Sequence, residues 1–296
     1  MRRQSAKRRA EQYYLNAAWG WRGSPSQPPV PQNIQTIYRP SEKLSDGRTE
    51  RKAMNLAKQK ILITGGTSGI GAALAAQLQS RGASVITCAR SRPEHPLHGV
   101  VYYRCDLASP AERADLVSRI RNEHPDTSVL INNAAIQHPL DFIGGEAQSL
   151  QTTLAQELAL NLEAPVALAA ALLPLIAKQQ QGAIVNITTA LALAPKKSAP
   201  VYCAAKAGLH NFTRALRYQT ETAAPHVKIQ EIVPPLVATR MTDGRGSGKI
   251  TPEEAAAAII RAIENGRNEC YIGKTRLLKQ LLRIAPNLAY RILRNG

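Results

Sequence analysis

The sequence predicts an α/β protein with a Rossmann-type, doubly wound parallel sheet of about seven strands, in a single domain with a flexible N-terminal extension. From residue 60 onward, short apolar runs alternate with longer stretches of helical periodicity. Such alternation gives parallel strands with helices on both faces. Most of the strand runs are continuously apolar, which is typical of strands that helices cover on both sides.

The expected strands and helices follow one another in a regular order. The strands are 60–64, 84–88, 100–104, 128–131, 183–188, 228–233 and 269–272. The helices lie at about 69–81, 109–123, 146–179, 200–223 and 251–265. Ser109 and Thr251 each place a hydroxyl N-cap before a proline at the first helical position. The longest apolar run, 164–177, is shorter than a membrane-spanning helix needs, so we expect a helix in the core or at a subunit contact.

The net charge of +17 is concentrated in the two ends of the chain. Residues 1–53 carry 11 Lys and Arg against 4 Asp and Glu, and residues 274–296 carry 6 basic residues and no acidic one. Residues 54–273, the expected Rossmann domain, hold 21 basic and 17 acidic residues. Because this body is nearly balanced in charge, no nucleic-acid partner is expected for it.

Residues 1–53 are rich in Pro, Ser, Gln and Gly and lack sustained apolar periodicity. Such a segment buries too little apolar surface to offset the entropy of ordering it. One interpretation is a flexible tail or an upstream extension outside the working protein, since Met54 leads directly into the first strand as a natural start would. A targeting peptide and a nucleic-acid-binding tail are the other interpretations.

Residues 274–296 form a basic tail in which Leu and Ile recur at helical spacing, with an interruption at Pro286. A basic amphipathic helix can lie on an anionic membrane surface. Packing of its apolar face against the domain or a second subunit is the other interpretation, and the favoured one.

The four cysteines are widely scattered, and no two of them have metal-ligand or CxxC spacing. This pattern suits a reduced intracellular protein. We therefore expect a cytoplasmic protein without a metal site, with peripheral membrane contact by the tail as the alternative.

A glycine-rich turn follows the first strand, in the order Thr64, Gly65, Gly66, Thr67, Ser68, Gly69, Ile70 and Gly71. Gly65 permits the tight turn, while Gly69 and Gly71 let the backbone approach a diphosphate and let the helix pack closely. Free N–H groups at the start of the following helix favour an anion. The turn therefore predicts a dinucleotide site.

Tyr202 and Lys206 place a phenol and an ammonium group four residues apart, on one face of an expected helix. A tyrosine with a pKa near ~10 is a poor base at neutral pH. A fixed cation nearby favours the phenolate and lowers that pKa, as general acid/base catalysis requires.

These motifs, in this order, resemble the short-chain dehydrogenase/reductase superfamily, and the resemblance extends to about residue 273. It implies an NAD(P)-dependent oxidoreductase that transfers hydride between nicotinamide and a carbonyl or alcohol, with Tyr202 as general acid/base. Lys206 is implied to lower the pKa of that tyrosine and to bind the nicotinamide ribose. Further cofactor contacts implied by matching positions are Asp106, Leu107, Asn133, Ala134, Val237 and Thr239.

Two more positions match the superfamily's catalytic set. Thr189 follows the strand 183–188, where the superfamily has a serine, and is implied to hydrogen-bond the substrate oxygen. Asn161 is implied to position a water that links Lys206 to solvent. Within the superfamily, residues such as 132–137 and 233–239 are most similar to the DltE-like oxidoreductases.

The end of the second strand bears on the choice of nicotinamide cofactor. An acid there would bind a ribose hydroxyl and repel a 2′-phosphate, whereas a basic residue favours the phosphate. Ala89 takes the place of the acid and Arg90 follows, with Arg92 near enough to assist. NADP(H) is therefore favoured over NAD(H).

Two other functions remain open on the sequence. A dinucleotide-binding regulator without turnover is one, because Thr189 replaces serine and Pro235 replaces a glycine, which crowds the pocket and removes a backbone donor. A membrane-peripheral scaffold that uses the basic ends is the other. For the enzyme, a small-molecule carbonyl or alcohol is the expected partner and a homodimer or homotetramer the expected assembly.

Overall fold

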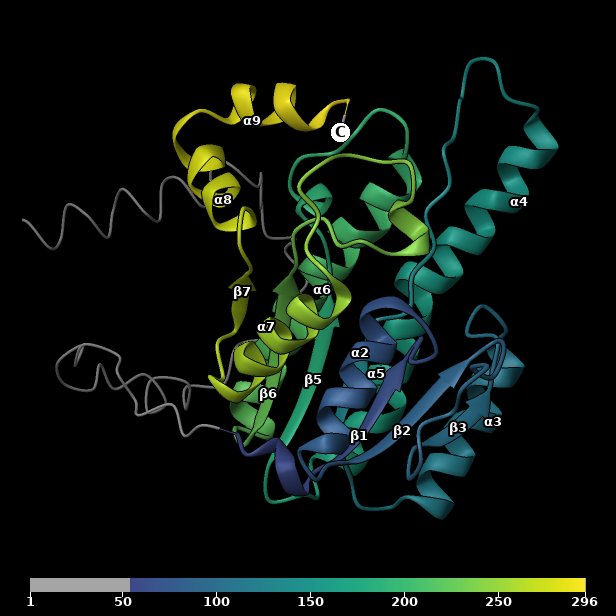
Figure 1. Cartoon of the computed structure of the whole chain (residues 1–296), viewed down its shortest axis with the longest axis vertical. Helices are drawn as coiled ribbons and strands as arrows, with labels where there is room; N and C mark the ends of the chain where they lie inside the picture. Colours follow the sequence, from purple (N-terminus) through teal and green to yellow (C-terminus); the bar gives the residue numbers. More distant parts are fainter. Residues whose placement is uncertain (1–53, 296) are drawn as a thin grey trace, which may run out of the picture. The chain divides into compact units, whose positions relative to one another are not determined.

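A computed structural model describes residues 54–295, and the interpretations of residues 1–53 lie outside this range. Seven parallel strands form one sheet in the order β3-β2-β1-β4-β5-β6-β7 (Figure 1). They are β1 (Lys60–Thr64), β2 (Ser84–Ala89), β3 (Val101–Arg104), β4 (Thr127–Asn132), β5 (Gly182–Ile187), β6 (Val227–Val233) and β7 (Glu269–Tyr271). The strand order reverses between β1 and β4, and ligands of open α/β sheets bind beyond the carboxyl ends of the strands at such a point.

Helices cover both faces of the sheet, so the predicted doubly wound architecture is confirmed. They are α2 (Gly69–Ser80), α3 (Pro110–Glu123), α4 (Ala147–Leu158), α5 (Ala164–Ile176), α6 (Pro200–Ala223), α7 (Pro252–Glu264), α8 (Thr275–Ile284) and α9 (Pro286–Leu293). Helices α2 and α7 pack on one face, and α3, α5 and α6 on the other (Figure 1).

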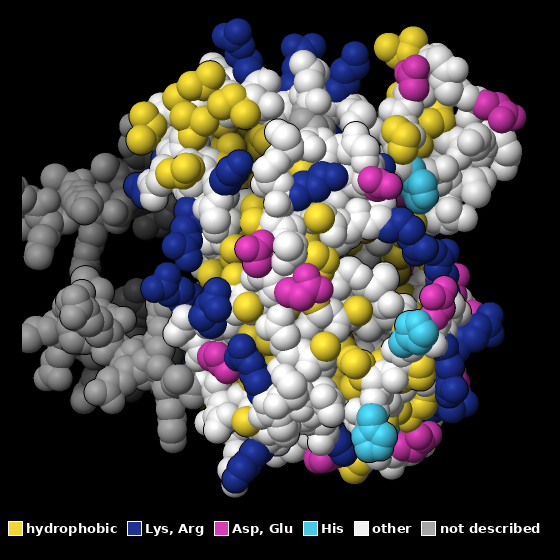
Figure 2. All heavy atoms as spheres, viewed as in Figure 1, with side chains coloured by type: hydrophobic (Ala, Val, Ile, Leu, Met, Phe, Trp, Pro, Cys, Tyr) yellow, Lys and Arg dark blue, Asp and Glu magenta, His cyan; other side chains and the backbone are white. Residues whose placement is uncertain are grey.

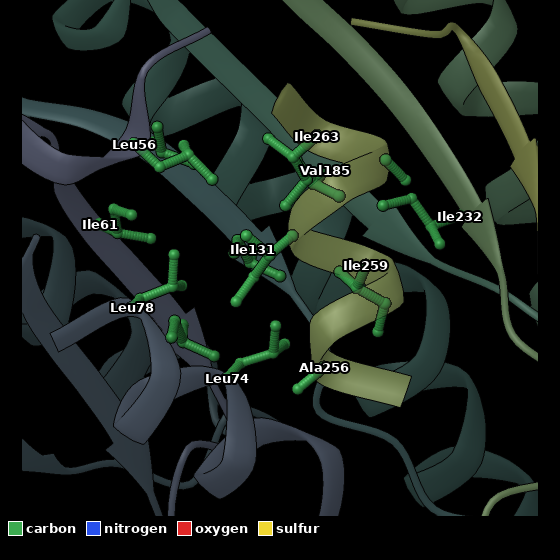
Figure 3. Close-up of a cluster of buried hydrophobic side chains, with 14 of the residues drawn as sticks. Leu56, Ile61, Leu74, Leu78, Ile131, Val185, Ile232, Ala256, Ile259 and Ile263 are labelled. Atoms are coloured by element: carbon green, nitrogen blue, oxygen red, sulfur yellow. The ribbon is translucent and has the colours of Figure 1, made fainter. Parts of the chain in front are cut away.

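Alternate residues of each central strand point into two separate cores. Ile61 of β1 joins Leu74 of α2 and Ile259 of α7 in one cluster (Figure 3). Leu62, the next residue of β1, joins Leu172 of α5 in the other. Both sides of the strand are therefore apolar, because neither side faces water.

The expected helix 146–179 is continuous from Ala147 to Ile176, but a π-helical turn, Ala159–Glu163, interrupts its regular pattern. By length and composition alone this stretch is long and apolar enough to cross a membrane. Its second half, however, buries Leu168, Leu172 and Ile176 against the sheet. In this fold the second half of the stretch is a core helix, whereas α4 buries only Glu157.

The basic tail forms two helices, α8 and α9, and Pro286 begins the second one. The Thr275 hydroxyl donates to the Val233 carbonyl at 3.0 Å. At the far end, the Lys197 N–H donates to the Arg294 carbonyl at 2.8 Å. The tail is thus attached to the Rossmann domain at both of its ends.

Candidate active site

The glycine turn between β1 and α2 can hold its shape only with glycine. Gly65 and Gly69 have φ values of 68° and 52°, in the left-handed region that favours glycine. A Cβ on Gly71 would lie 2.1 Å from the Gly65 carbonyl oxygen. The turn and the first residues of α2 are therefore in direct backbone contact, as a dinucleotide cradle requires.

The N-terminus of α2 is suited to an anion. Ser68 is the N-cap, and its side chain makes no capping hydrogen bond. The first turn contains no acidic residue. Backbone N–H groups at this end of the helix, together with its dipole, favour a phosphate.

Two side chains tie the glycine turn to the end of β4. The Thr64 hydroxyl accepts the N–H groups of Asn133 and Ala134, at 2.9 and 3.0 Å. The Asn133 amide donates in return to the Thr64 carbonyl at 3.0 Å. Asn133 and Ala134, both predicted cofactor contacts, thus lie at the point where the strand order reverses.

The ends of β2 and β3 carry the residues expected on the adenosine side. Arg90 is exposed immediately after Ala89, the last residue of β2. The Asp106 carboxylate accepts the N–H of Ala108 at 3.0 Å, so it is held in a turn. Leu107 is buried. No acidic side chain follows β2 directly.

The segment after β6 lies over the glycine turn. Val237 is buried and pairs with Ile250 as an isolated bridge. A Cβ on Gly69 would lie 3.0 Å from Cγ2 of Thr239. Val237 and Thr239, which we predicted to be contacts for the nicotinamide amide, are therefore brought to the same end of the sheet as the glycine turn.

Tyr202 and Lys206 lie on α6, at the carboxyl ends of β4 and β5. Tyr202 is 8% exposed and Lys206 2%. The Lys206 ammonium lies 6.0 Å from the centroid of the Tyr202 ring. It donates to the Ile187 carbonyl, at the end of β5, at 2.9 Å. The predicted phenol–ammonium pair is thus formed on one helix face.

The pKa of the phenol differs from the expectation. Burial raises the pKa of Tyr202, the charges of Cys203 and Glu157 raise it further, and only Arg245 lowers it. Burial also lowers the pKa of Lys206 to about 8, against the opposing effect of Glu231. The lowering of the Tyr202 pKa predicted from the spacing is therefore wrong for this structure, because desolvation disfavours the phenolate.

Thr189 and Asn161 approach this pair from two other elements. Thr189 is the second residue after β5, and its hydroxyl accepts the N–H of Leu191 at 3.3 Å. Asn161 lies in the π-helical turn and is fully buried. Its amide is held by the backbone of Ile136, through bonds of 2.8 and 3.1 Å. Its predicted contact with a water stays a prediction.

A small cavity of about 10 Å³ adjoins Lys206, which is about the size of one water molecule. Asn132 also lines it. The side-chain oxygen of Asn132 is buried and has no hydrogen-bond partner within residues 54–295. This position beside the ammonium group thus has room and hydrogen-bonding capacity for one water.

Three charged residues near Tyr202 were not anticipated. Glu157 is buried and accepts the His138 N–H. Lys196 is 8% exposed, and Arg245 donates to the side chain of Gln137. Neither Lys196 nor Arg245 forms an ion pair within the described part of the chain. Both lie in loops without periodicity, where the sequence carries no signal for them.

Behind Lys206, a buried network links α6 to β6. Both oxygens of Glu231 are bonded, one to the Thr188 hydroxyl at 2.6 Å and the other to His210 at 2.7 Å. His210 continues the helix face of Tyr202 and Lys206 by one more turn. The network supports the helix face that carries Tyr202 and Lys206.

The fold and this set of elements agree with the comparisons to known proteins. The chain belongs to the short chain dehydrogenase family, whose family model matches residues 59–249.

Individual relatives and solved structures show which members of the family this chain is similar to. The uncharacterized oxidoreductase DltE of Bacillus subtilis (strain 168) is 35% identical over 227 residues, which cover 73% of this chain and 88% of the relative. This confirms the predicted similarity to the DltE-like oxidoreductases. A short chain dehydrogenase from Burkholderia cenocepacia J2315, solved in complex with NADP, has a TM-score of 0.73 at 24% identity and covers 82% of this chain and 100% of its own. A second, from Sphingobium yanoikuyae with NADPH, has a TM-score of 0.64 at 24% identity, with 78% and 95% covered.

Proposed function

We propose that this oxidoreductase is an NADP(H)-dependent carbonyl reductase or alcohol dehydrogenase in which Tyr202 is the general acid/base. The proposal depends on one observation. The buried Tyr202–Lys206 pair lies at the same end of the sheet as the glycine turn, whose backbone leaves no room for side chains.

The residues present fit a dinucleotide. Gly65, Thr67, Ser68, Gly69, Ile70 and Gly71 would hold the diphosphate at the start of α2, with the remaining contacts from the ends of β3, β4 and β6. The bound nicotinamide supplies or accepts the hydride. A preformed glycine cradle and a helix N-terminus without acids support this role.

Side chains of the protein carry out the proposed proton transfers. Tyr202 donates its proton to the carbonyl oxygen in reduction and removes a proton from the alcohol in the reverse direction. Burial raises the pKa of Tyr202, which favours the protonated phenol and therefore the reductive direction over alcohol oxidation. Thr189 donates a hydrogen bond to the substrate oxygen. Lys206 and the adjoining water-sized cavity supply a route for proton return.

The test of the proposal is Tyr202→Phe in a reductase screen across aldehydes, ketones and quinones with both cofactors. Removing the hydroxyl should lower kcat by about 10²–10⁴-fold, because the proposed proton donor is lost. Steady-state NADPH oxidation measures the rate, and fluorescence titration measures NADPH affinity, which should stay unchanged. Tyr218→Phe, at an exposed position on α6, is the matched control.

A Tyr202→Phe protein as active as the wild type would contradict the assignment. Unmeasurable turnover on every carbonyl, with intact NADPH binding, would favour the dinucleotide-binding regulator instead.

The preference for NADP(H) is supported by Arg90 at the end of β2 and by the two fold neighbours solved with NADP or NADPH. Arg90→Ala should weaken NADPH binding about tenfold or more while leaving NADH nearly unaffected, since a charge-assisted bond to the 2′-phosphate is lost. Titration with each cofactor measures this. Arg119→Ala on α3 is the control, and equal losses for both cofactors would refute the role of Arg90.

The remaining expectations also stand as proposals. They are a catalytic domain at 54–273 followed by a tail at 274–296, a homodimer or homotetramer, and a cytoplasmic location. Light scattering after size-exclusion chromatography measures the assembly.

A further inference from the structure

The outer face of the C-terminal helices α8 and α9 is apolar and uncovered among the described residues. Leu277 is 73% exposed and Ile284 82%. Leu288, Tyr290 and Ile292 are exposed as well. Figure 2 shows a hydrophobic patch over these helices at the upper left of the molecule, with Lys and Arg side chains beside it. We call these five side chains the tail face.

The inner side of α8 and α9 is held against the Rossmann domain, so the tail face points away from it. Thr275 and Ala289 are buried on the inner side of the two helices. Lys279 forms an ion pair with Glu269 of β7 at 3.1 Å. Because the inner side is bonded to the domain, the apolar residues remain exposed when the helices are folded. A patch of this kind marks an interaction surface.

The charge around the tail face is net basic. Residues 274–296 contain six basic residues and no acidic one. The neighbouring loops 188–199 and 234–250 are each net basic, with a net charge of +2. A second copy of the chain would bring like charges together, and residues 1–53 are themselves net basic. The complementary partner is anionic and apolar.

The tail that carries this face contacts two loops beside the candidate active site. A Cβ on Gly248, in the loop after β6, would lie 2.7 Å from the Lys274 ammonium group. The Arg294 carbonyl accepts the N–H of Lys197, in the segment between Thr189 and the start of α6 at Pro200. The tail therefore borders both loops that surround the catalytic pair.

A second group of exposed apolar side chains lies at the same end of the sheet. Ile143 is fully exposed and Phe142 is 57% exposed, on the loop that leads from β4 to α4. Figure 1 shows this loop and α9 at the same end of the molecule, beyond the carboxyl ends of the strands. Two apolar prominences with basic loops between them suit a broad, flat partner.

We propose that the tail face docks the protein on an anionic lipid bilayer, with the mouth of the active site turned toward the membrane. Leucine and isoleucine side chains enter the boundary between headgroups and acyl chains, and the surrounding Lys and Arg contact lipid phosphates. On the reductase function proposed above, the docked enzyme takes an amphipathic, membrane-dissolved carbonyl compound as its substrate.

The experiment is cosedimentation of the full chain with vesicles of phosphatidylcholine alone or with about one-third phosphatidylglycerol. The wild type should pellet with the anionic vesicles, and less so at high salt. The pair Leu277→Gln/Ile284→Gln should lower vesicle affinity by at least about tenfold, because two exposed side chains lose their apolar burial. Tyr218→Gln, an exposed apolar change on α6, should bind as the wild type does.

A charge variant separates the electrostatic contribution to vesicle binding from the apolar contribution. Arg283→Gln/Arg291→Gln should lower affinity for anionic vesicles by about tenfold and weaken its dependence on salt. Circular dichroism checks that each variant is folded. Since all four positions are exposed, no core packing is removed.

Several outcomes would overturn the proposal. One is a wild type that does not pellet, and another is a Leu277→Gln/Ile284→Gln protein that pellets equally well. A wild-type dimer that the same pair disrupts, without vesicle binding, would identify a self-interface instead. Turnover of a short, soluble aldehyde should be equal in wild type and variant. Its absence in both would count against the reductase function and leave the docking result intact.

Discussion

At the residue scale, the shape of the candidate cofactor site depends on Gly71 having no side chain. Its α-carbon faces the Gly65 carbonyl, and the Asn133 amide lies 2.6 Å from where a Cβ would stand. The same amide holds the end of β1 to the end of β4. One absent side chain thus permits helix α2, the turn and β4 to meet where the dinucleotide is expected.

Gly71→Ala should lower the free energy of unfolding by about 3 kcal/mol, because the methyl group meets backbone that cannot move aside. NADPH affinity should fall with it. Denaturant unfolding and cofactor titration measure the two effects. Gly208→Ala is the control, because its new methyl meets only the side chain of Leu162, at 3.2 Å. Equal stability of the two variants would refute the argument.

Residue spacing predicted the phenol–ammonium pair but not its pKa values. A spacing of four places Tyr202 and Lys206 on one helix face wherever the helix lies. Whether the cation or the desolvation dominates depends on how deeply α6 is buried and on Glu157 and Arg245, which come from distant segments. Only the folded chain brings these together.

At the scale of elements, the contact between α6 and β6 depends on a buried carboxyl group. Glu231 is 2% exposed, and its two oxygens reach Thr188 and His210. Burying such a group without partners is costly. The hydrogen bonds therefore keep the face of α6 that carries Tyr202 and Lys206 in register with the sheet.

His210→Ala should lower the free energy of unfolding by about 2–3 kcal/mol, since one oxygen of Glu231 is left buried without its partner. Guanidinium unfolding followed by circular dichroism measures the loss. His95→Ala, at an exposed position, should change it by less than about 0.5 kcal/mol. A cost at His210 as small as at His95 would show that the bond contributes little.

The π-helical turn at Ala159–Glu163 is a feature that apolar periodicity in the sequence did not predict. Apolar spacing predicted one helix over 146–179, and the structure has one continuous helical stretch. The turn coincides with Asn161, whose amide pairs with the backbone of Ile136 in another segment. A contact between separate segments leaves no mark in the local pattern.

At the scale of the whole molecule, Glu269 joins the tail to the domain. Its carboxylate contacts Arg214 of α6 at 2.7 Å and Lys279 of α8 at 3.1 Å. Burial raises the pKa of Glu269, but the hydrogen bonds and charges of these two residues outweigh it and leave the pKa at about 2. The ionised carboxylate therefore stabilises the folded chain.

The stabilisation by Glu269 depends on pH. Because the folded pKa is about 2 and the ordinary value 4.5, the stabilisation is complete above about pH 4.5 and is lost as the pH falls toward 2. At pH 7, Glu269→Gln should be less stable by about 2 kcal/mol, and the difference should vanish near pH 2. Unfolding curves across this range measure it.

Asp115→Asn, which breaks the exposed pair with Arg119, is the control and should cost less than about 0.5 kcal/mol. A difference between wild type and Glu269→Gln that does not depend on pH would contradict the ion-pair explanation.

The amino-acid sequence alone determined the fold class, the order of strands and helices, the glycine turn and the Tyr202–Lys206 spacing, because these depend on local periodicity and short-range geometry. The tertiary structure decided the pKa shifts at the site, the placement of Lys196 and Arg245 near the phenol, and the side of the tail that faces outward. Each of these depends on burial and on contacts between segments far apart in the chain, which no local pattern records.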